Sequence, residues 1–214
     1  MGAATLTNRG GDTVEVSNFS PQNYLIHVIK RAVSNAQNLH ITLKGTGEII
    51  LMSQRGEFFA NTDTLPQICS TPVDQLEVSL LENDDVRVGK LVDNIGRNID
   101  ELLWFAGFYA SDGRLMDGCY RDDVVQLHHW PNITRIPITS NTIRIASLLT
   151  RYPTSLVLAK HLLKVDMNEL YQFYSAARCS GLARVLNRKP EEPVMKPHRN
   201  QALLGKLLNK IAGL

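Results

Sequence analysis

The run "YRDDVVQLHHW" (residues 120–130) holds the residue types in this chain that best suit metal or acid–base chemistry. It offers two adjacent carboxylates, Asp122 and Asp123, and two adjacent imidazoles, His128 and His129. The apolar residues between the two pairs predict a strand, in which neighbouring side chains point to opposite faces. The two imidazoles therefore cannot easily bind one ion together. An enzyme or metal-binding protein that uses these four residues is the most distant of our three functional hypotheses.

Other signatures of catalysis are missing from the sequence. The run "GTGEII" (residues 45–50) lacks the later Gly and Lys of a phosphate-binding loop, and it predicts a hairpin turn. No Ser or Cys lies in a nucleophile-elbow pattern. Cys69, Cys119 and Cys179 form no C-x-x-C pair, which argues against a disulfide framework or a zinc site of cysteines. We expect a protein without catalytic residues, cofactor or metal.

Composition and charge limit the classes of protein to which this chain can belong. The chain has 214 residues, of which 43% are hydrophobic and 21% charged, as in ordinary globular proteins. No run approaches the roughly 18 apolar residues of a membrane helix. The N-terminus has no apolar segment typical of a secretory signal, and the three dispersed cysteines suit a reducing compartment, so we expect a cytoplasmic location.

The net charge of +2 is unevenly distributed along the chain. Residues 1–142 contain 11 Lys and Arg against 17 Asp and Glu, a formal charge of −6. Residues 143–214 contain 12 Lys and Arg against 4 Asp and Glu, a formal charge of +8. An acidic front and a basic back indicate two modules. The basic module could meet nucleic acid, an acidic protein, or the acidic module of another copy.

The front half predicts an α+β fold. A first helix follows Pro21, with Leu25, Val28, Ile29 and Ala32 on one face. Alternating and buried patterns then predict antiparallel strands near residues 38–45, 48–54, 57–62 and 74–81. Asn98 and Glu101 resemble a capping box at the start of a second helix. We predict a loose tail over residues 1–20 and an α+β domain over residues 21–136; no family is recognised there.

The back half predicts three helices and a strand. The proline-containing run "WPNITRIPITSN" (residues 130–141) suggests a module boundary, and a second domain is predicted over residues 137–188. Asn141, Thr154 and Asp166 are candidate caps of the three helices. Glu169 would complete a second capping-box-like pair with Asp166. The glycine in "SGLA" (residues 180–183) then stops the third helix, and "LARVL" suggests a strand.

This order of elements resembles the winged helix-turn-helix superfamily over about residues 141–188, chiefly through Ala159, the "KVD" turn and "SGLA". The resemblance implies that the third helix reads a DNA groove or meets a protein partner. Apart from Glu169, the residues predicted to face outward there are Asn168, Tyr171, Gln172, Ser175 and Arg178. Cations that could grip phosphates from the flanks include Lys160, Lys164, Arg184, Arg188 and Lys189.

The predicted outward face has one basic residue, which is a weak footprint for DNA. Tyr171 and Arg178 suit a protein interface instead. A proline-rich linker (residues 189–198) precedes a predicted amphipathic helix (residues 199–214), which could dock on a partner, on a sister chain or on its own domain. Its apolar face consists of Leu204, Leu207, Leu208 and Ile211. The sequence thus favours a non-enzymatic regulatory or adaptor protein, with a DNA-binding regulator as the alternative.

Overall fold

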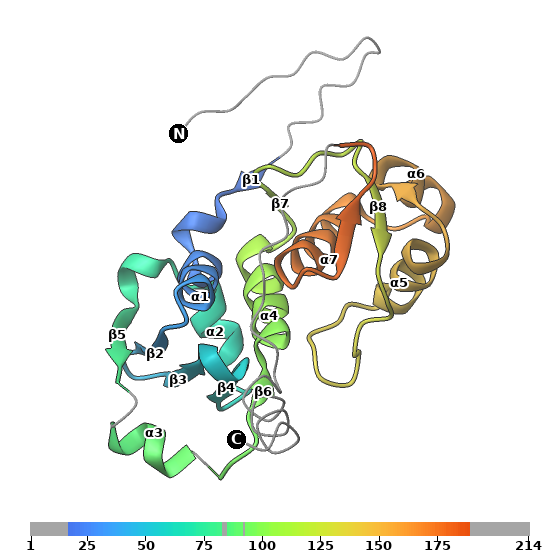
Figure 1. Cartoon of the computed structure of the whole chain (residues 1–214). Coiled ribbons are helices and arrows are strands. Elements are labelled where there is room, and N and C mark those ends of the chain that lie inside the picture. The colour runs from blue at the N-terminus through green and yellow to red at the C-terminus, as the bar shows by residue number, and fades with distance from the viewer. Residues whose placement is uncertain (1–16, 83–84, 92, 189–214) are drawn as a thin grey trace, which may run out of the picture.

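The computed structural model describes residues 17–82, 85–91 and 93–188. Within these residues, a five-stranded and a three-stranded antiparallel sheet lie on either side of a central helix, α4 (Ile99–Ser111) (Figure 1). Helices and antiparallel strands together confirm the predicted α+β class. No helix in the described ranges combines the length and the apolar character needed to cross a membrane.

The larger sheet has the strand order β5-β2-β3-β4-β6 and belongs to the front half of the chain. Its strands are β2 (Asn38–Leu43), β3 (Gly47–Met52), β4 (Glu57–Ala60), β5 (Glu77–Leu81) and β6 (Arg97–Asn98). The helices of this half are α1 (Leu25–Ser34), α2 (Leu65–Ser70), α3 (Val86–Leu91) and α4, with short 3-10 turns at Pro21–Asn23, Ser53–Arg55 and Val73–Gln75.

The alternation of β2 decides which side of this sheet is dry. Leu39 and Ile41 are buried, and they pair with the buried Leu51 and Ile49 of β3. His40, between them, binds the Glu48 carboxylate through its Nε2 atom at 2.6 Å on the opposite face. Because side chains alternate across a strand, one register places these four residues on the same side, whereas Ile50 and Met52 of β3 join a smaller cluster with Val88 on the other side.

The N-terminal segment is ordered closer to the start of the chain than the sequence predicted. Residues Asn18–Phe19 form β1, which pairs in parallel with β7 (Leu115–Met116). The Phe19 ring is buried, meets Tyr24 edge-on at 5.8 Å and lies below the Arg114 guanidinium. The prediction of a loose tail is therefore wrong for these two residues, because an aromatic anchor fixes them. Residues 1–16 lie outside the described part of the chain.

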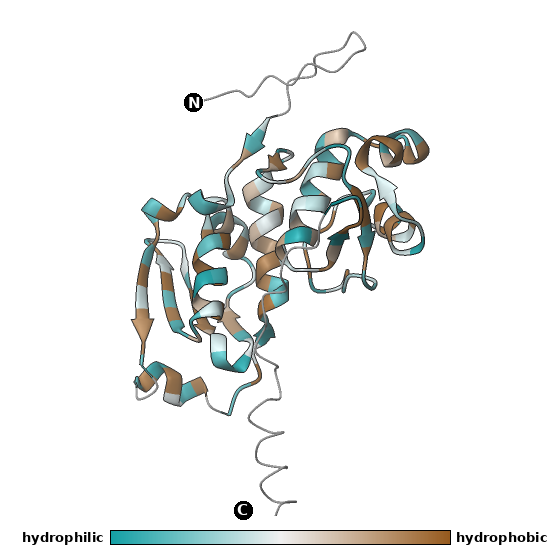
Figure 2. Cartoon of the chain, turned by 45° about the horizontal axis from the view of Figure 1, so that its top comes forward, coloured by the Kyte–Doolittle hydropathy of each residue, from teal (hydrophilic) through white to brown (hydrophobic). Residues whose placement is uncertain are grey.

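Helix α4 is the centre of the molecule. It is hydrophobic on nearly every side (Figure 2), and a helix of that kind must be covered all round. Asn98 caps it as predicted, since its Oδ1 accepts a hydrogen bond from the Asp100 N–H at 2.8 Å. Glu101, the expected partner in the capping box, accepts instead from Arg97 Nε at 2.9 Å. The prediction that Asn98 caps this helix is confirmed. Glu101, which was expected to bond back to Asn98, forms an ion pair with Arg97.

The back half contains the predicted helices and strand, with shifted caps. Its elements are α5 (Thr142–Arg151), β9 (Thr154–Ser155), α6 (Leu156–Leu163), α7 (Met167–Cys179) and β10 (Ala183–Val185). Ser155, not Thr154, caps α6, since its Oγ accepts from the Leu158 N–H at 3.2 Å. Gly181 has φ of +72°, the left-handed conformation expected after α7. The winged-helix resemblance stays a prediction.

Asn141, the predicted cap of the first helix, and Glu169, the predicted capping-box partner of Asp166, bind each other. The Glu169 carboxylate accepts hydrogen bonds from the Asn141 N–H at 3.0 Å and from its side-chain amide at 2.8 Å. These bonds tie the start of α7 to the start of α5. Burial alone would raise the pKa of Glu169, but hydrogen bonds from Thr139 and Asn141 outweigh it and lower the pKa. The pair therefore holds two helices together, whereas the sequence suggested separate local caps.

Strand β8 (Val124–Leu127) joins the two halves. It lies between β9 and β10 in the smaller sheet, where Val125 pairs with Thr154 on one side and with Val185 on the other. One hydrophobic cluster also runs from α1 through α4 to α5. Strand pairing and packing both cross the boundary that the sequence suggested at residues 136 and 137. Lys189, the linker at 189–198 and the helix at 199–214 lie outside the described residues.

Candidate functional site

The polar face of α7, which the sequence predicts to meet DNA or a partner, packs against α4. Tyr171 is 5% exposed and Ser175 is fully buried. Gln172 donates a hydrogen bond through Nε2 to the Phe108 carbonyl oxygen of α4 at 3.2 Å. The expectation that Tyr171 and Ser175 face solvent is therefore wrong. Two of the predicted contact residues are internal packing residues of the chain.

A close helix crossing explains why the pattern on α7 misleads. A Cβ atom on Gly107 of α4 would lie 2.9 Å from the Ser175 carbonyl oxygen and 2.9 Å from the Ala176 Cα. The missing side chain lets the two backbones approach, and Figure 1 shows the helices side by side. Small polar residues such as Ser175 then fit between helices. The sequence of α7 alone contains no signal that another helix covers this face.

The other predicted contact residues lie on several elements. Those exposed to solvent are Lys160 and Lys164 of α6, Asn168 of α7 and Arg184 of β10. Arg178 is half-buried and donates to the Ala183 carbonyl oxygen at 3.5 Å. The Arg184 guanidinium binds the Gln126 side-chain oxygen at 2.6 Å. The helix that should read a groove thus presents one exposed member of its predicted set, Asn168.

Asp123 and Arg188 form a buried anchor for α7. Asp123 is 1% exposed, and its Oδ2 accepts hydrogen bonds from the Tyr174 hydroxyl at 2.7 Å and the Tyr120 N–H at 2.9 Å. Its Oδ1 pairs with Arg188, whose guanidinium lies 4.0 Å from the centre of the Tyr120 ring. Burial raises the pKa of Tyr174 far above its usual range, so its hydroxyl stays protonated and donates.

The remaining members of the acid and imidazole run have no shared geometry. Asp122, His128 and His129 are all exposed, and β8 ends before the imidazoles, at Leu127. The parts of the chain that the structure describes contain no group of three or more His, Cys, Asp or Glu side chains placed to hold a metal ion. Of the four residues singled out in this run, Asp123 alone has a defined set of partners, and its role there is structural.

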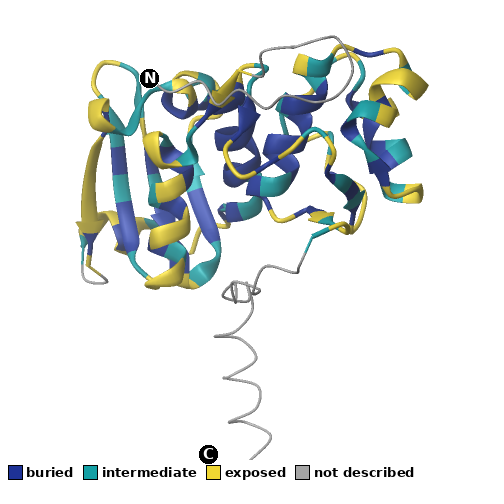
Figure 3. Cartoon of the chain, turned by 90° about the horizontal axis from the view of Figure 1, so that it is seen from above, coloured by how far each residue is buried: buried dark blue, intermediate teal, exposed yellow. Residues whose placement is uncertain are grey.

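A different surface is left open, where α1 passes β5. Figure 3 shows β5 as the exposed strand at the left-hand edge of the larger sheet. Val78 and Leu80 are 41% and 62% exposed, although their cross-strand partners Ile41 and Leu39 are buried. The cavity beside them has a volume of about 430 Å³. It is lined by His27, Val28, Arg31, Ala32, Gln37, Leu39, Val73, Leu76, Val78 and Leu80. We call it the α1–β5 groove.

The groove combines apolar walls with positive charge. His27 and Arg31 of α1 are its ionisable lining residues, and no acidic side chain lines it. Among the residues that the structure describes, β5 is the end strand of its sheet, so alternate N–H and C=O groups point away from β2 without a neighbouring strand there. Sequence analysis predicted the strand but missed the site. The available signal was two apolar residues in alternation next to the acidic run. The sequence of β5 does not show, however, that this strand lies at the end of its sheet.

Comparison with known proteins gives this chain no relative. No protein-family model, no curated protein and no solved structure matches it.

Proposed function

We propose that this chain is a non-enzymatic regulatory or adaptor protein that binds an extended segment of a protein partner in the α1–β5 groove. The observation behind the proposal is the open apolar edge of β5 beside Arg31 of α1. The sequence placed the interaction on the winged-helix-like module and the C-terminal helix. The burial of Tyr171 and Ser175 moves the proposal to the front half.

The proposed binding mode is strand addition. An incoming strand would form main-chain hydrogen bonds with β5 and place alternate side chains over Val78 and Leu80. Apolar residues suit those two positions, because each is an aliphatic side chain already on the α1 side of the sheet. An acidic residue suits the position on that same face that lies nearest Arg31. The partner is therefore an extended segment whose side chains toward α1 are apolar, apart from an acidic one beside Arg31.

The edge lacks the protection that native sheets normally have. Edge strands are usually blunted by Lys, Pro or a bulge, because an open strand promotes pairing with other chains. β5 reads EVSLL and contains neither residue. A long-lived apolar edge in a folded protein is most simply explained by a partner that covers it.

The sharpest test uses a fluorescein-labelled ten-residue Val–Glu peptide, which has Val at alternate positions, Glu in place of the Val nearest Arg31, and Thr between them; binding is followed by anisotropy and by amide hydrogen exchange of β5. We expect saturable binding that slows exchange on β5 and weakens at least tenfold in Leu80→Lys, about 1.4 kcal/mol. Ser79→Lys is the matched control, since it adds the same charge on the opposite face of the same strand.

Several results would overturn the proposal. If a peptide with Lys in place of Glu binds equally well, the partner need not be acidic. If Ser79→Lys weakens binding as much as Leu80→Lys does, the peptide does not bind on the α1 face of β5. Sedimentation of the free chain adds a further check. If the chain is a dimer that Leu80→Lys makes monomeric, the occupant of the groove is a second copy and not an extended partner segment.

DNA binding is the second candidate, supported by the exposed Lys160, Lys164 and Arg184 of the basic half. Titration of duplex DNA over a salt series separates the two functions. Submicromolar binding at physiological salt with a steep salt slope, lost in Lys160→Ala combined with Lys164→Ala, would replace the adaptor proposal. The adaptor proposal expects weak binding that changes little in this double variant.

A further inference from the structure

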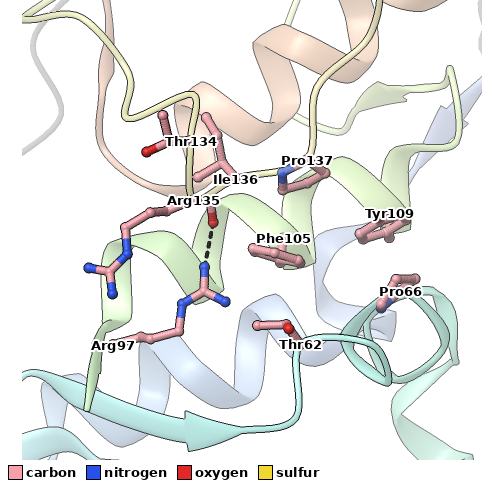
Figure 4. A pocket seen from close by; sticks show the side chains of 9 residues that line it. All are labelled: Thr62, Pro66, Arg97, Phe105, Tyr109, Thr134, Arg135, Ile136 and Pro137. Atoms are coloured by element: carbon pink, nitrogen blue, oxygen red, sulfur yellow. Dashed lines mark hydrogen bonds between the residues drawn. The ribbon is translucent and has the colours of Figure 1, made fainter. Parts of the chain in front are cut away.

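A second cavity lies where the connector from β8 to α5 (residues 128–141) crosses α4 (Figure 4). Its volume is about 470 Å³, within the range of small-molecule sites. Arg97, Phe105 and Tyr109 line it from the front half of the chain, and Thr134, Arg135 and Pro137 line it from the connector. The two sheets are thus joined across a cavity of ligand size.

Two side-chain bonds hold the connector over α4. Arg97 donates through Nη2 to the Arg135 carbonyl oxygen, which Figure 4 marks as a dashed line. Trp104 donates through Nε1 to the Pro137 carbonyl oxygen at 3.2 Å. Because both bonds go to the main chain, they fix the path of the connector whatever its side chains do. The wall of the cavity is therefore preformed.

The mouth of the cavity is positively charged. Arg97 and Arg135 share the carboxylate of Glu101, with N–O distances of 2.9 and 3.5 Å. These three groups together have one excess positive charge. The Arg135 side chain is 51% exposed, and its contact with Glu101 is the longer one. A guanidinium in this position can turn toward an incoming anion at little cost in structure.

The floor of the cavity is aromatic. The Phe105 ring lies 5.3 Å from the Arg97 guanidinium, which fixes the arginine over the ring. Tyr109 lies further along the same face of α4, and burial raises the pKa of its hydroxyl, so it remains a donor at neutral pH. Flat rings stack well on such a surface, and a guanidinium forks onto carboxylate or phosphate oxygens.

From this geometry we propose that the cavity binds a small aromatic anion, with its carboxylate or phosphate at Arg135 and its ring against Tyr109, beside the edge of Phe105. The proposal does not depend on the α1–β5 groove. A ligand here would touch both α4 and the connector that leads into α5. It would therefore stabilise the junction between the two sheets.

Calorimetric titration with AMP and with 1-naphthoate tests the site, and adenosine and 1-naphthamide serve as uncharged counterparts. We expect at least one anion to bind at least tenfold more tightly than its counterpart. Arg135→Gln should reduce that binding at least tenfold, whereas Arg184→Gln, on β10, should leave it unchanged. Which of the two anions binds identifies the acidic group. Trp104 fluorescence in a Trp130→Phe background should change with AMP, since its indole holds the wall.

Three outcomes would overturn the proposal. They are no saturable binding of either anion at millimolar concentration, equal binding of the uncharged counterparts, and unchanged affinity in Arg135→Gln. Each variant is checked for an unchanged melting temperature, which the exposure of Arg135 and Arg184 predicts. Binding of the Val–Glu peptide at β5 should be the same in Arg135→Gln as in the original chain, so the two proposals fail independently.

Discussion

Helix α7 and strand β5 differ in how far their surfaces are buried, and the sequence of neither element suggests the difference. α7 has polar residues on the face expected to be free, yet Tyr171 and Ser175 of that face are buried, and Ser175 lies against α4. β5 has Val78 and Leu80 on the face expected to be covered, yet both are exposed. The difference arises from neighbours: Gly107 lets a helix close over α7, whereas β5 is the last strand of its sheet.

The contrast teaches that exposure depends on tertiary neighbours more than on the local pattern. A polar face indicates compatibility with water, not contact with it. An apolar edge indicates a surface that needs cover, and the described residues leave this one open. Variants in the closed region should therefore alter folding, and variants in the open region should alter binding.

The largest effect is expected from Asp123→Ala in the closed region. Removal of the carboxylate leaves Arg188 and the Tyr174 hydroxyl without their buried partner. Breaking such a pair costs about 3–5 kcal/mol of unfolding free energy, measured by urea denaturation. Asp122→Ala, at the exposed neighbour, should stay within about 0.5 kcal/mol. Equal small effects would mean that the buried anchor contributes little.

The next effect compares two leucines that face each other across strands β2 and β5. Leu39 is buried and Leu80, its partner, is 62% exposed. Leu39→Ala should lower the unfolding free energy by about 2–5 kcal/mol because it leaves a cavity. Leu80→Ala should change it by less than about 1 kcal/mol, since half or more of the side chain is already in water. A large loss in Leu80→Ala would show that the edge is covered in solution.

A smaller effect is expected from Gly107→Ala, where α4 crosses α7. The added methyl group would clash with backbone atoms of α7, and overpacking of this kind costs about 1–3 kcal/mol. Gly89→Ala in α3 is the matched control, because its Cβ would meet no atom within 4 Å. There the better helix propensity of Ala should stabilise by up to about 1 kcal/mol. Thermal and urea unfolding of both variants measure the difference.

The smallest effect concerns Asp85, a half-buried carboxylate just before α3. Hydrogen bonds from Arg87 lower the pKa of Asp85 to about 2. The bonds therefore favour the folded state above the ordinary pKa of Asp, about 4, and this contribution disappears as pH falls through 2. NMR titration of the Asp85 carboxyl should show this value, and Arg87→Gln should return it toward 4. A value near 4 in the original chain would contradict the contact.

Local elements were predictable from this sequence, and their assembly was not. The hairpin of β2 and β3, the Asn98 cap and the Gly181 stop all follow from side-chain alternation, capping chemistry and glycine geometry. These signals lie within a few residues of each other. The cap predicted at Thr154 lies one residue further on, at Ser155, whereas Asp166 is at its predicted cap position but makes no side-chain capping hydrogen bond.

The candidate sites depend on long-range pairs that no single stretch encodes. The cover on Ser175 requires Gly107, and the wall of the aromatic cavity requires Arg97 and Trp104 to reach the connector. Asp123 looked like a candidate for chemistry because its partners Tyr174 and Arg188 are far along the chain. The sequence shows which residues have reactive side chains. It does not show which of these side chains already pair with other residues of the chain.

The central position of β8 has a consequence for synthesis. During translation β8 emerges before both of its partners, so its two edges stay unpaired until β9 and then β10 follow. The smaller sheet can close only when the chain has been made through Val185. A fragment that begins at residue 137 lacks the strand that joins β9 to β10, whereas one that begins at residue 118 retains it. Expression from residue 137 should therefore fail, because the fragment lacks both β8 and α4, the helix that packs against α7.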